Sequence, residues 1–227
     1  MQKINNKGFY KELFDFAIPI GLQNLLIALI GASDALMLGR LTQDAVSAVS
    51  LANQIAFIMS LFVAAVVGGG GALIAQYWGK GDRTTVKNLF CTLIKWSLGV
   101  SLVFFILAMF MPEWLMRIYT PDTALIKIGA SYLRIVSVSY LFTAVTQCYY
   151  FIMKLERKAS KSVVISVVML VVDVVIDFFL IYGIGGAPKL GANGSAYSTV
   201  AVELAALIWV IAESCRGESI RPNIQGI

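Results

Sequence analysis

The sequence is organised as a series of long apolar runs separated by short polar or glycine- and proline-rich segments. Each run has the roughly 20 residues that an α-helix needs to cross the hydrocarbon core of a bilayer. The runs are continuously apolar and do not alternate between apolar and polar positions, as the strands of a membrane β-barrel would. The pattern therefore predicts an all-α integral membrane protein with six transmembrane helices. These spans cover approximately residues 12–38, 46–77, 88–111, 124–153, 163–182 and 193–213.

The segments between the spans differ in their content of basic residues, which is informative because cytoplasmic loops are enriched in Lys and Arg. One side of the membrane holds Lys3, Lys7, Lys11, Lys80, Arg83, Lys87, Lys154, Arg157, Lys158, Lys161, Arg216 and Arg221. The other side holds only Arg40, Arg117, Lys127 and Lys189. We predict that the richer side is cytoplasmic. Both termini of the chain are then inside, and the protein is a multi-pass protein of the plasma (inner) membrane.

The composition agrees with this prediction and argues against several other classes of function. The chain is 59% hydrophobic and 14% charged, whereas soluble domains have about 25% charged residues. It has no histidine, and its three cysteines are far apart, so no zinc site or disulfide framework is indicated. The net charge of +5 comes from the basic loops and does not indicate a nucleic-acid partner. The GxGD string at 79–82 matches one found in intramembrane aspartyl proteases, but here it lies in a loop rather than a span. We therefore predict that the protein is not an enzyme. The apolar spans make the lipid bilayer its expected partner.

Four acidic residues interrupt the apolar spans, and they are the strongest candidates for function. Asp34 lies about 6 Å and Asp177 about 8 Å from the outer ends of their spans, given a rise of 1.5 Å per residue. Asp173 is one turn deeper, on the same helical face as Asp177, and Glu203 falls near mid-membrane. An ionised carboxylate facing lipid costs about 2.5–3.5 kcal/mol or more. We therefore expect these acids to face a cavity and to bind a proton or a small cation. In the alternative interpretation they hydrogen-bond neighbouring hydroxyls or reach the outer interface.

Other positions have both structural and functional interpretations. Pro19 removes a backbone hydrogen bond early in the first span and favours a kink there, which is either a hinge or a bend stabilised by neighbours. Tyr140, Tyr149 and Tyr150 on the fourth span could line an aromatic cavity for an organic cation, although lipid-facing or interfacial placement explains them equally well. The glycines at 68–71 favour close packing against another helix.

Four segments together resemble the multidrug and toxin extrusion (MATE) transporters. They are DALMLGRLTQDAVSAVSLANQ (34–54), AQYWGKGD (75–82), DVVIDFFLI (173–181) and LGANGSAYSTV (190–200). The resemblance covers essentially the whole chain and implies a twelve-helix transporter built from two six-helix lobes. Residues 1–227 are then expected to form the N-terminal lobe, with 214–227 as a cytoplasmic linker to a second lobe, which is either a C-terminal half or a second copy.

The resemblance also implies roles for individual residues. Pro19 matches the proline of the family's kinked first helix, and Asp34 matches its first-helix acid. The family's Asn-x-x-x-Asp matches Asp173-x-x-x-Asp177, so this chain has aspartate where asparagine is usual. Thr199 matches a threonine of the sixth helix. Asp34, Asp173, Asp177 and Thr199 are thus expected to hold the coupling ion, with a sodium ion at Asp34 and Asp177 as the only metal.

The function implied by the resemblance is secondary antiport. The lobe would help to export drugs, meaning small organic cationic or amphipathic molecules, in exchange for sodium ions or protons. No cofactor other than this coupling ion is expected. Two alternatives remain at this point, namely a flippase of related fold for lipid-linked precursors and a non-transporting membrane assembly protein. The few intramembrane basic residues argue against the flippase, and a dry, sealed acidic site would favour the assembly protein.

Overall fold

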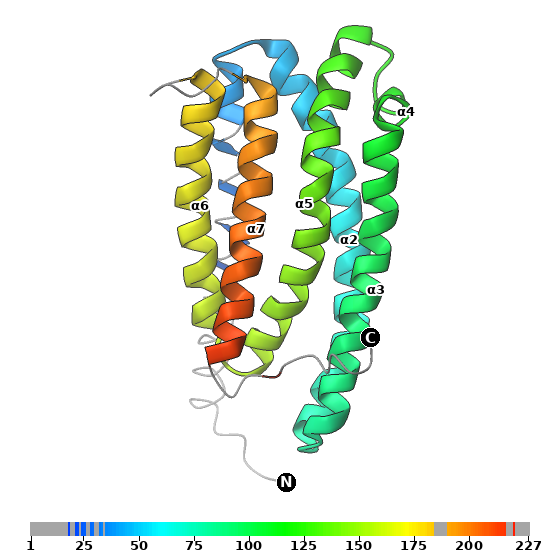
Figure 1. The fold of residues 1–227 in the computed structure, drawn as a ribbon, viewed down its shortest axis with the longest axis vertical. Helices are drawn as coiled ribbons and strands as arrows, with labels where there is room; N and C mark the ends of the chain where they lie inside the picture. Colours follow the sequence, from blue (N-terminus) through cyan, green and yellow to red (C-terminus); the bar gives the residue numbers. More distant parts are fainter. Residues whose placement is uncertain are drawn as a thin grey trace.

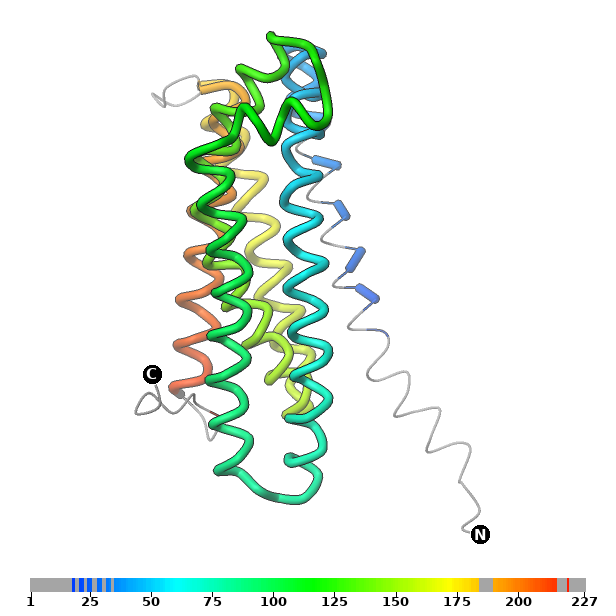
Figure 2. The backbone as a smooth tube through the Cα atoms, turned by 90° about the vertical axis from the view of Figure 1, so that its right-hand side faces the viewer, coloured from blue at the N-terminus to red at the C-terminus, as the bar shows by residue number. Residues whose placement is uncertain are grey.

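The structure, a computed structural model, describes residues 18, 21–22, 24–25, 28–29, 32–33, 35–183, 190–216 and 220. Every element with assigned bounds in these ranges is a helix, and the long helices run side by side along one axis (Figures 1 and 2). The helices are α2 (Gln43–Gly79), α3 (Arg83–Phe110), α4 (Pro112–Arg117), α5 (Thr123–Leu155), α6 (Ala159–Tyr182) and α7 (Ala192–Arg216). All except α4 are long and apolar enough to cross a membrane. The predicted all-α membrane architecture is confirmed.

The predicted spans two to six correspond to α2, α3, α5, α6 and α7, whose ends lie within about five residues of the predicted ones. The predicted first span, 12–38, lies partly outside the described residues, and its described positions from residue 18 onward are helical. The segment 111–122 was expected to be a loop, but it contains the short helix α4. Pro112 opens this helix, where its missing N–H group leaves no intrahelical hydrogen bond unmade.

Side chains in the connecting segments determine where several helices begin. Thr42, Asp82 and Asp122 each accept a hydrogen bond from a backbone N–H group in the first turn of α2, α3 and α5, at 3.1, 3.0 and 2.8 Å. Short polar side chains at this position satisfy N–H groups that have no partner within the helix. Gly183 ends α6 in the left-handed conformation with φ of 71°, which glycine adopts without steric cost.

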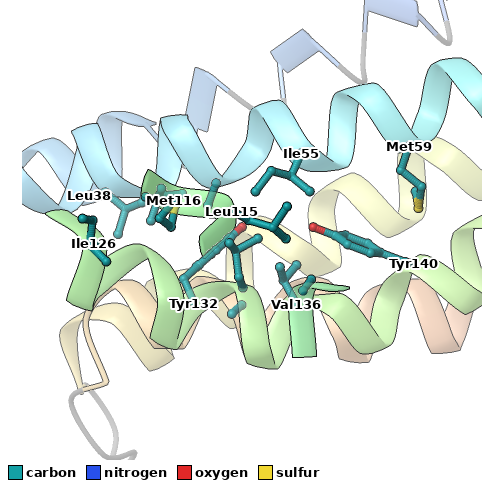
Figure 3. Packing of buried hydrophobic residues seen from close by; sticks show 14 of the residues in the cluster. Leu38, Ile55, Met59, Leu115, Met116, Ile126, Tyr132, Val136 and Tyr140 are labelled. Atoms are coloured by element: carbon teal, nitrogen blue, oxygen red, sulfur yellow. The ribbon is translucent and has the colours of Figure 1, made fainter. Parts of the chain in front are cut away.

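Helix α5 is the centre of the bundle and packs against α2, α3 and α7. Half of its most apolar stretch is buried (50%), against 22–33% for the other spanning helices. Two apolar clusters surround it. One lies toward the end that carries α4, where Tyr132, Val136 and Tyr140 of α5 face Ile55 and Met59 of α2 (Figure 3). The other lies toward the opposite end and includes Phe90, Ile152, Ile165 and Val210.

The outside of the bundle is apolar, as expected for a protein surrounded by lipid. Large hydrophobic side chains remain exposed along α2, α3, α6 and α7, which surround the central α5, among them Phe57, Phe62, Trp96, Val103, Phe110, Val171, Val175 and Ile208. A soluble monomer rarely exposes a contiguous apolar surface of this extent. At the end predicted to be cytoplasmic, Lys161 of α6 forms an ion pair with Glu213 of α7. Nearby, Glu156 accepts a hydrogen bond from the backbone N–H of the buried Ile220 at 2.7 Å.

Helices α6 and α7 come into close contact at Gly194. A Cβ atom at this position would lie 2.8 Å from the carbonyl carbon and oxygen of Leu180 and 3.0 Å from the nitrogen of Ile181. These are backbone atoms, which cannot move aside as a flexible side chain can. Nearby, the Asn193 amide donates a hydrogen bond to the Ser131 hydroxyl at 2.9 Å and fixes the start of α7 against α5. The glycine therefore allows α7 to pack directly against the end of α6.

This contact leads to a stability prediction. Gly194→Ala should lower the free energy of unfolding by about 1–3 kcal/mol, the usual range for overpacking, because the backbones of α6 and α7 must separate. Gly69→Ala is the matched control, since a Cβ atom there meets nothing within 4 Å; it should be neutral or slightly stabilising. The measurement is thermal unfolding of the purified chain in detergent. Equal melting temperatures for the two variants would show that the close contact at Gly194 is not a constraint.

Candidate functional site

Two carboxylates are buried on α6. Asp173 is 4% exposed and Asp177 is 1% exposed, and their separation by four residues places both on one face of the helix. They therefore face the interior of the bundle and not the lipid. A sequence prediction based on spacing alone could place the two acids on one face, but it could not say which neighbouring helix that face contacts.

Helix α7 supplies the partner of Asp173. The hydroxyl of Ser198 donates a hydrogen bond to Asp173 Oδ1 at 2.7 Å, and it also lies 3.2 Å from the backbone carbonyl oxygen of Asp173. Ser198 is completely buried. Sequence reasoning missed this residue, because it singled out the neighbouring Thr199. The signal was nevertheless present in GSAYST, where three small hydroxyl residues follow Gly194 within one and a half turns.

The hydroxyl of Thr199 is engaged within its own helix, donating a hydrogen bond to the Ser195 carbonyl oxygen at 3.0 Å. Ser195 is also fully buried, and its hydroxyl has no hydrogen-bond partner among the described residues. Asp177 lies between the contact of Leu180 with Gly194 and the contact of Asp173 with Ser198. Because the two helices are antiparallel, this register places Asp177 at about the level of the first turns of α7. The polar face of α7 therefore lies opposite the acidic face of α6.

A third acid extends this polar layer toward the membrane centre. Glu203 of α7 is partly buried and interacts electrostatically with Asp173 of α6. The sequence pattern indicated Glu203 as an intramembrane acid.

Two of the predicted site residues, Pro19 and Asp34, lie outside the described residues. Beyond Asp34 in the sequence, Met37 contacts α6: the Tyr182 hydroxyl donates a hydrogen bond to the Met37 carbonyl oxygen at 3.0 Å. Leu38 and Ile181 also belong to the same apolar cluster. The end of the first predicted span is thus joined to the end of α6.

The three tyrosines proposed for a substrate cavity do not line a single space. Tyr140 is 2% exposed and belongs to the cluster near α4 (Figure 3), whereas Tyr149 is 7% exposed and belongs to the opposite cluster. Tyr149 also packs edge-on against Phe90 of α3, with ring centroids 5.2 Å apart. Tyr150 is partly buried and packs against this opposite cluster as well. Two cavities in the described part of the chain, of about 460 and 280 Å³, are lined by other residues.

The arrangement can bind a small cation through oxygen atoms. Carboxylate and hydroxyl groups of α6 and α7 converge in an apolar bundle, where an uncompensated negative charge is costly. Arg134 of α5 pairs with Glu113 of α4 at 3.5 Å, near one end of the bundle. Within the described residues, no three acidic or cysteine side chains are grouped to hold a metal ion.

The hydrogen bond between Ser198 and Asp173 can be tested directly. Ser198→Ala removes a donor from a buried carboxylate and should lower the free energy of unfolding by about 1–3 kcal/mol. Ser101→Ala is the matched control, because Ser101 is also fully buried but donates only to the Leu98 carbonyl oxygen of its own helix, at 3.1 Å. Thermal unfolding in detergent at neutral pH measures both. The contact is unimportant if the two variants lose the same stability.

Comparison with known proteins gives a consistent result. The sequence profile of the MatE family matches residues 19–179. The chain is 30% identical to the multidrug resistance protein PmpM of Pseudomonas aeruginosa over 214 residues, covering 88% of this chain and 43% of the relative. It is 24% identical to the probable multidrug resistance protein YoeA of Bacillus subtilis, covering 91% of this chain and 45% of the relative. These relatives are named as resistance proteins and not as enzymes.

A solved structure shows the same fold. The MATE multidrug transporter DinF-BH, solved as a complex, superposes with a TM-score of 0.85 at 19% identity, covering 97% of this chain and 49% of that one. The chain spans about half the length of the curated relatives it matches. The family profile covers most of the chain, including the first predicted span from Pro19 and the acidic face of α6. The chain therefore belongs to the MatE family of multidrug and toxin extrusion transporters.

Proposed function

We propose that this chain is one lobe of a secondary antiporter that exports small organic cationic or amphipathic molecules in exchange for protons or sodium ions. The observation that carries the proposal is the burial of Asp173 and Asp177 on the interior face of α6. Intramembrane acids that face a bundle interior are typical of ion pathways and proton relays. The names of the relatives, which describe multidrug resistance, support drugs as the substrate class.

In this proposal, Asp34 completes the ion site from the first span. The hydrogen bond from Tyr182 to Met37 supports this role, because it joins the end of that span to the end of α6. Ion binding would change the packing of the first span around Pro19, and the drug would be held less tightly in the ion-bound state. Transport then follows from the different affinities of the two conformations for the ion and the drug.

We further propose that the substrate cavity lies between this lobe and a second six-helix unit. The chain covers less than half of its relatives, and its outer surface is rich in apolar side chains that could face either lipid or such a unit. The tyrosines of α5 would then shape the lobe more than they line the cavity, since Tyr140 and Tyr149 are buried in its core.

The proposed orientation, with both termini in the cytoplasm, can be tested with the chain's own cysteines. Cys215, near the end of α7, is exposed, whereas Cys91 and Cys148 are buried. A membrane-impermeant maleimide should label the chain in inverted vesicles but not in intact cells. Cys215→Ser should abolish the labelling and thereby show which thiol reacted. Labelling from outside intact cells would reverse the orientation.

The ion-coupling role of Asp177 gives the main test of the function. Asp177→Asn keeps the size of the side chain but removes the charge that the coupling ion must neutralise. Gradient-driven efflux by the transporter that contains this lobe should fall at least about tenfold, the effect of losing about 1.4 kcal/mol of coupling. Drug binding should remain.

Asp173→Asn is the matched control, since it restores the residue usual in the family, and its effect should be far milder. The measurements are transport in vesicles under an imposed proton or sodium gradient, with drug binding determined separately for each variant. Normal transport by Asp177→Asn under both gradients would show that the buried pair is structural, and the proposed mechanism would be wrong.

A further inference from the structure

A groove between α2 and α3 opens on the outside of the bundle. It has a volume of about 280 Å³, and its walls include Gly70 and Leu73 of α2 and Leu93 and Trp96 of α3. Leu73 is 49% exposed and Trp96 is 67% exposed, so the groove is accessible from the surface. A Cβ atom at Gly70 would lie 2.7 Å from Leu93 Cδ1, so the absence of a side chain there makes room for Leu93. In a membrane protein, an apolar groove of this kind is covered by a lipid chain or by another protein.

The groove lies at the depth of lipid acyl chains. Leu93, one of its walls, and Ile74, which follows Leu73, belong to the apolar cluster that also contains Ile165 of α6 and Val210 of α7. Ile165 and Val210 each lie six residues, about 9 Å, inside the end of their helix. This level is within the hydrocarbon core of a bilayer about 30 Å thick. The position and the apolar walls therefore suit a hydrocarbon chain.

A lysine lies beyond one end of this groove. Tyr77 is one helical turn after Leu73, on the same face of α2, and Lys80 caps the helix. The Lys80 ammonium lies 5.1 Å from the centre of the Tyr77 ring, in a cation–π contact that leaves its N–H groups available. The ion pairs among the described residues do not include Lys80. The neighbouring Asp82 instead accepts hydrogen bonds from the backbone N–H and the hydroxyl of Thr85, at 3.0 and 2.6 Å.

We propose that the groove and Lys80 form a binding site for an anionic phospholipid. One acyl chain lies in the groove, and the phosphate group lies beside the Lys80 ammonium. Lys80 is seven residues beyond Leu73, which is about 10 Å along the helix axis, so the charge and the apolar surface follow one another as they do in a phospholipid. Basic side chains near a bilayer surface, next to membrane helices, are typical of headgroup recognition. The proposal concerns lipid binding and does not depend on the coupling ion or on a drug.

Phospholipids with brominated acyl chains provide the test, because bromine quenches tryptophan fluorescence only on contact. The purified chain is reconstituted with brominated phosphatidylglycerol, which is anionic, or with brominated phosphatidylcholine, which is zwitterionic. The quenching that is absent from Trp96→Phe is the part that arises in the groove. This part should show a preference of about fivefold for the anionic lipid, the effect of one basic side chain near a membrane surface.

Three variants separate the charge from the groove. Lys80→Gln should abolish the preference for the anionic lipid. Lys87→Gln is the matched control and should retain it, because Lys87 is also exposed near this end but lies about 200° around α3 from Leu89, a residue of the groove. Thr92→Phe should weaken the quenching by both lipids, since the larger side chain fills the groove. The Thr92 hydroxyl donates to the Asn88 carbonyl oxygen of its own helix at 3.0 Å, so this variant breaks no contact between helices.

Three results would overturn the proposal. Equal quenching of Trp96 by the two lipids would show ordinary contact with the surrounding bilayer. An equal loss of preference in Lys80→Gln and Lys87→Gln would show a general attraction to the basic end of the lobe. The third result comes from the same measurement on the transporter that contains this lobe. Absence of Trp96 quenching there would show that a second helical unit, and not a lipid, fills the groove.

Discussion

The packing of α6 against α7 is constrained by two carboxyl groups that lie inside an apolar bundle. Asp173 and Asp177 are almost completely buried on α6, so their surroundings must come from neighbouring helices rather than from water. Helix α7 meets this need because its first turns are rich in small residues. Gly194 brings it against the backbone of α6, and Ser198 then lies 2.7 Å from the carboxylate of Asp173. Close packing and polar stabilisation are therefore two consequences of the same short segment.

Helix α5 connects this polar layer to the rest of the lobe. It packs against both α6 and α7, and it also contributes side chains to the two apolar clusters. The clusters lie toward opposite ends of the bundle, and the acids of α6 and α7 lie in the polar layer beside α5. A rigid central helix with packed ends can hold oxygen atoms at fixed positions, which a binding site requires. This explains why Tyr140 and Tyr149 belong to the core although aromatic side chains suggested a cavity.

The sequence predicted those features that depend on one helix at a time. Hydrophobic runs located α2, α3, α5, α6 and α7 because length and polarity alone determine whether a segment spans a bilayer. The spacing of Asp173 and Asp177 was likewise sufficient to place them on one face. The missed features depend on two helices. Ser198 rather than Thr199 reaches Asp173 because of the rotation and register of α7, which no single-span pattern encodes. Helix α4 was missed because its six residues are too few for a periodic signal.

Aspartate at position 173, where the family resemblance implies asparagine, has a specific physical consequence. An asparagine amide both donates and accepts hydrogen bonds, whereas an ionised aspartate only accepts them. Ser198 already donates to Asp173, and the further acids along the polar layer, Asp177 and Glu203, supply no donor when ionised. The extra negative charge must therefore be balanced by a proton or a cation within this layer. In the mechanism we propose, aspartate in place of asparagine raises the number of protons or cations that the lobe must bind to neutralise its buried carboxylates. In this mechanism, such a lobe would bind more than one proton or sodium ion in each cycle of transport.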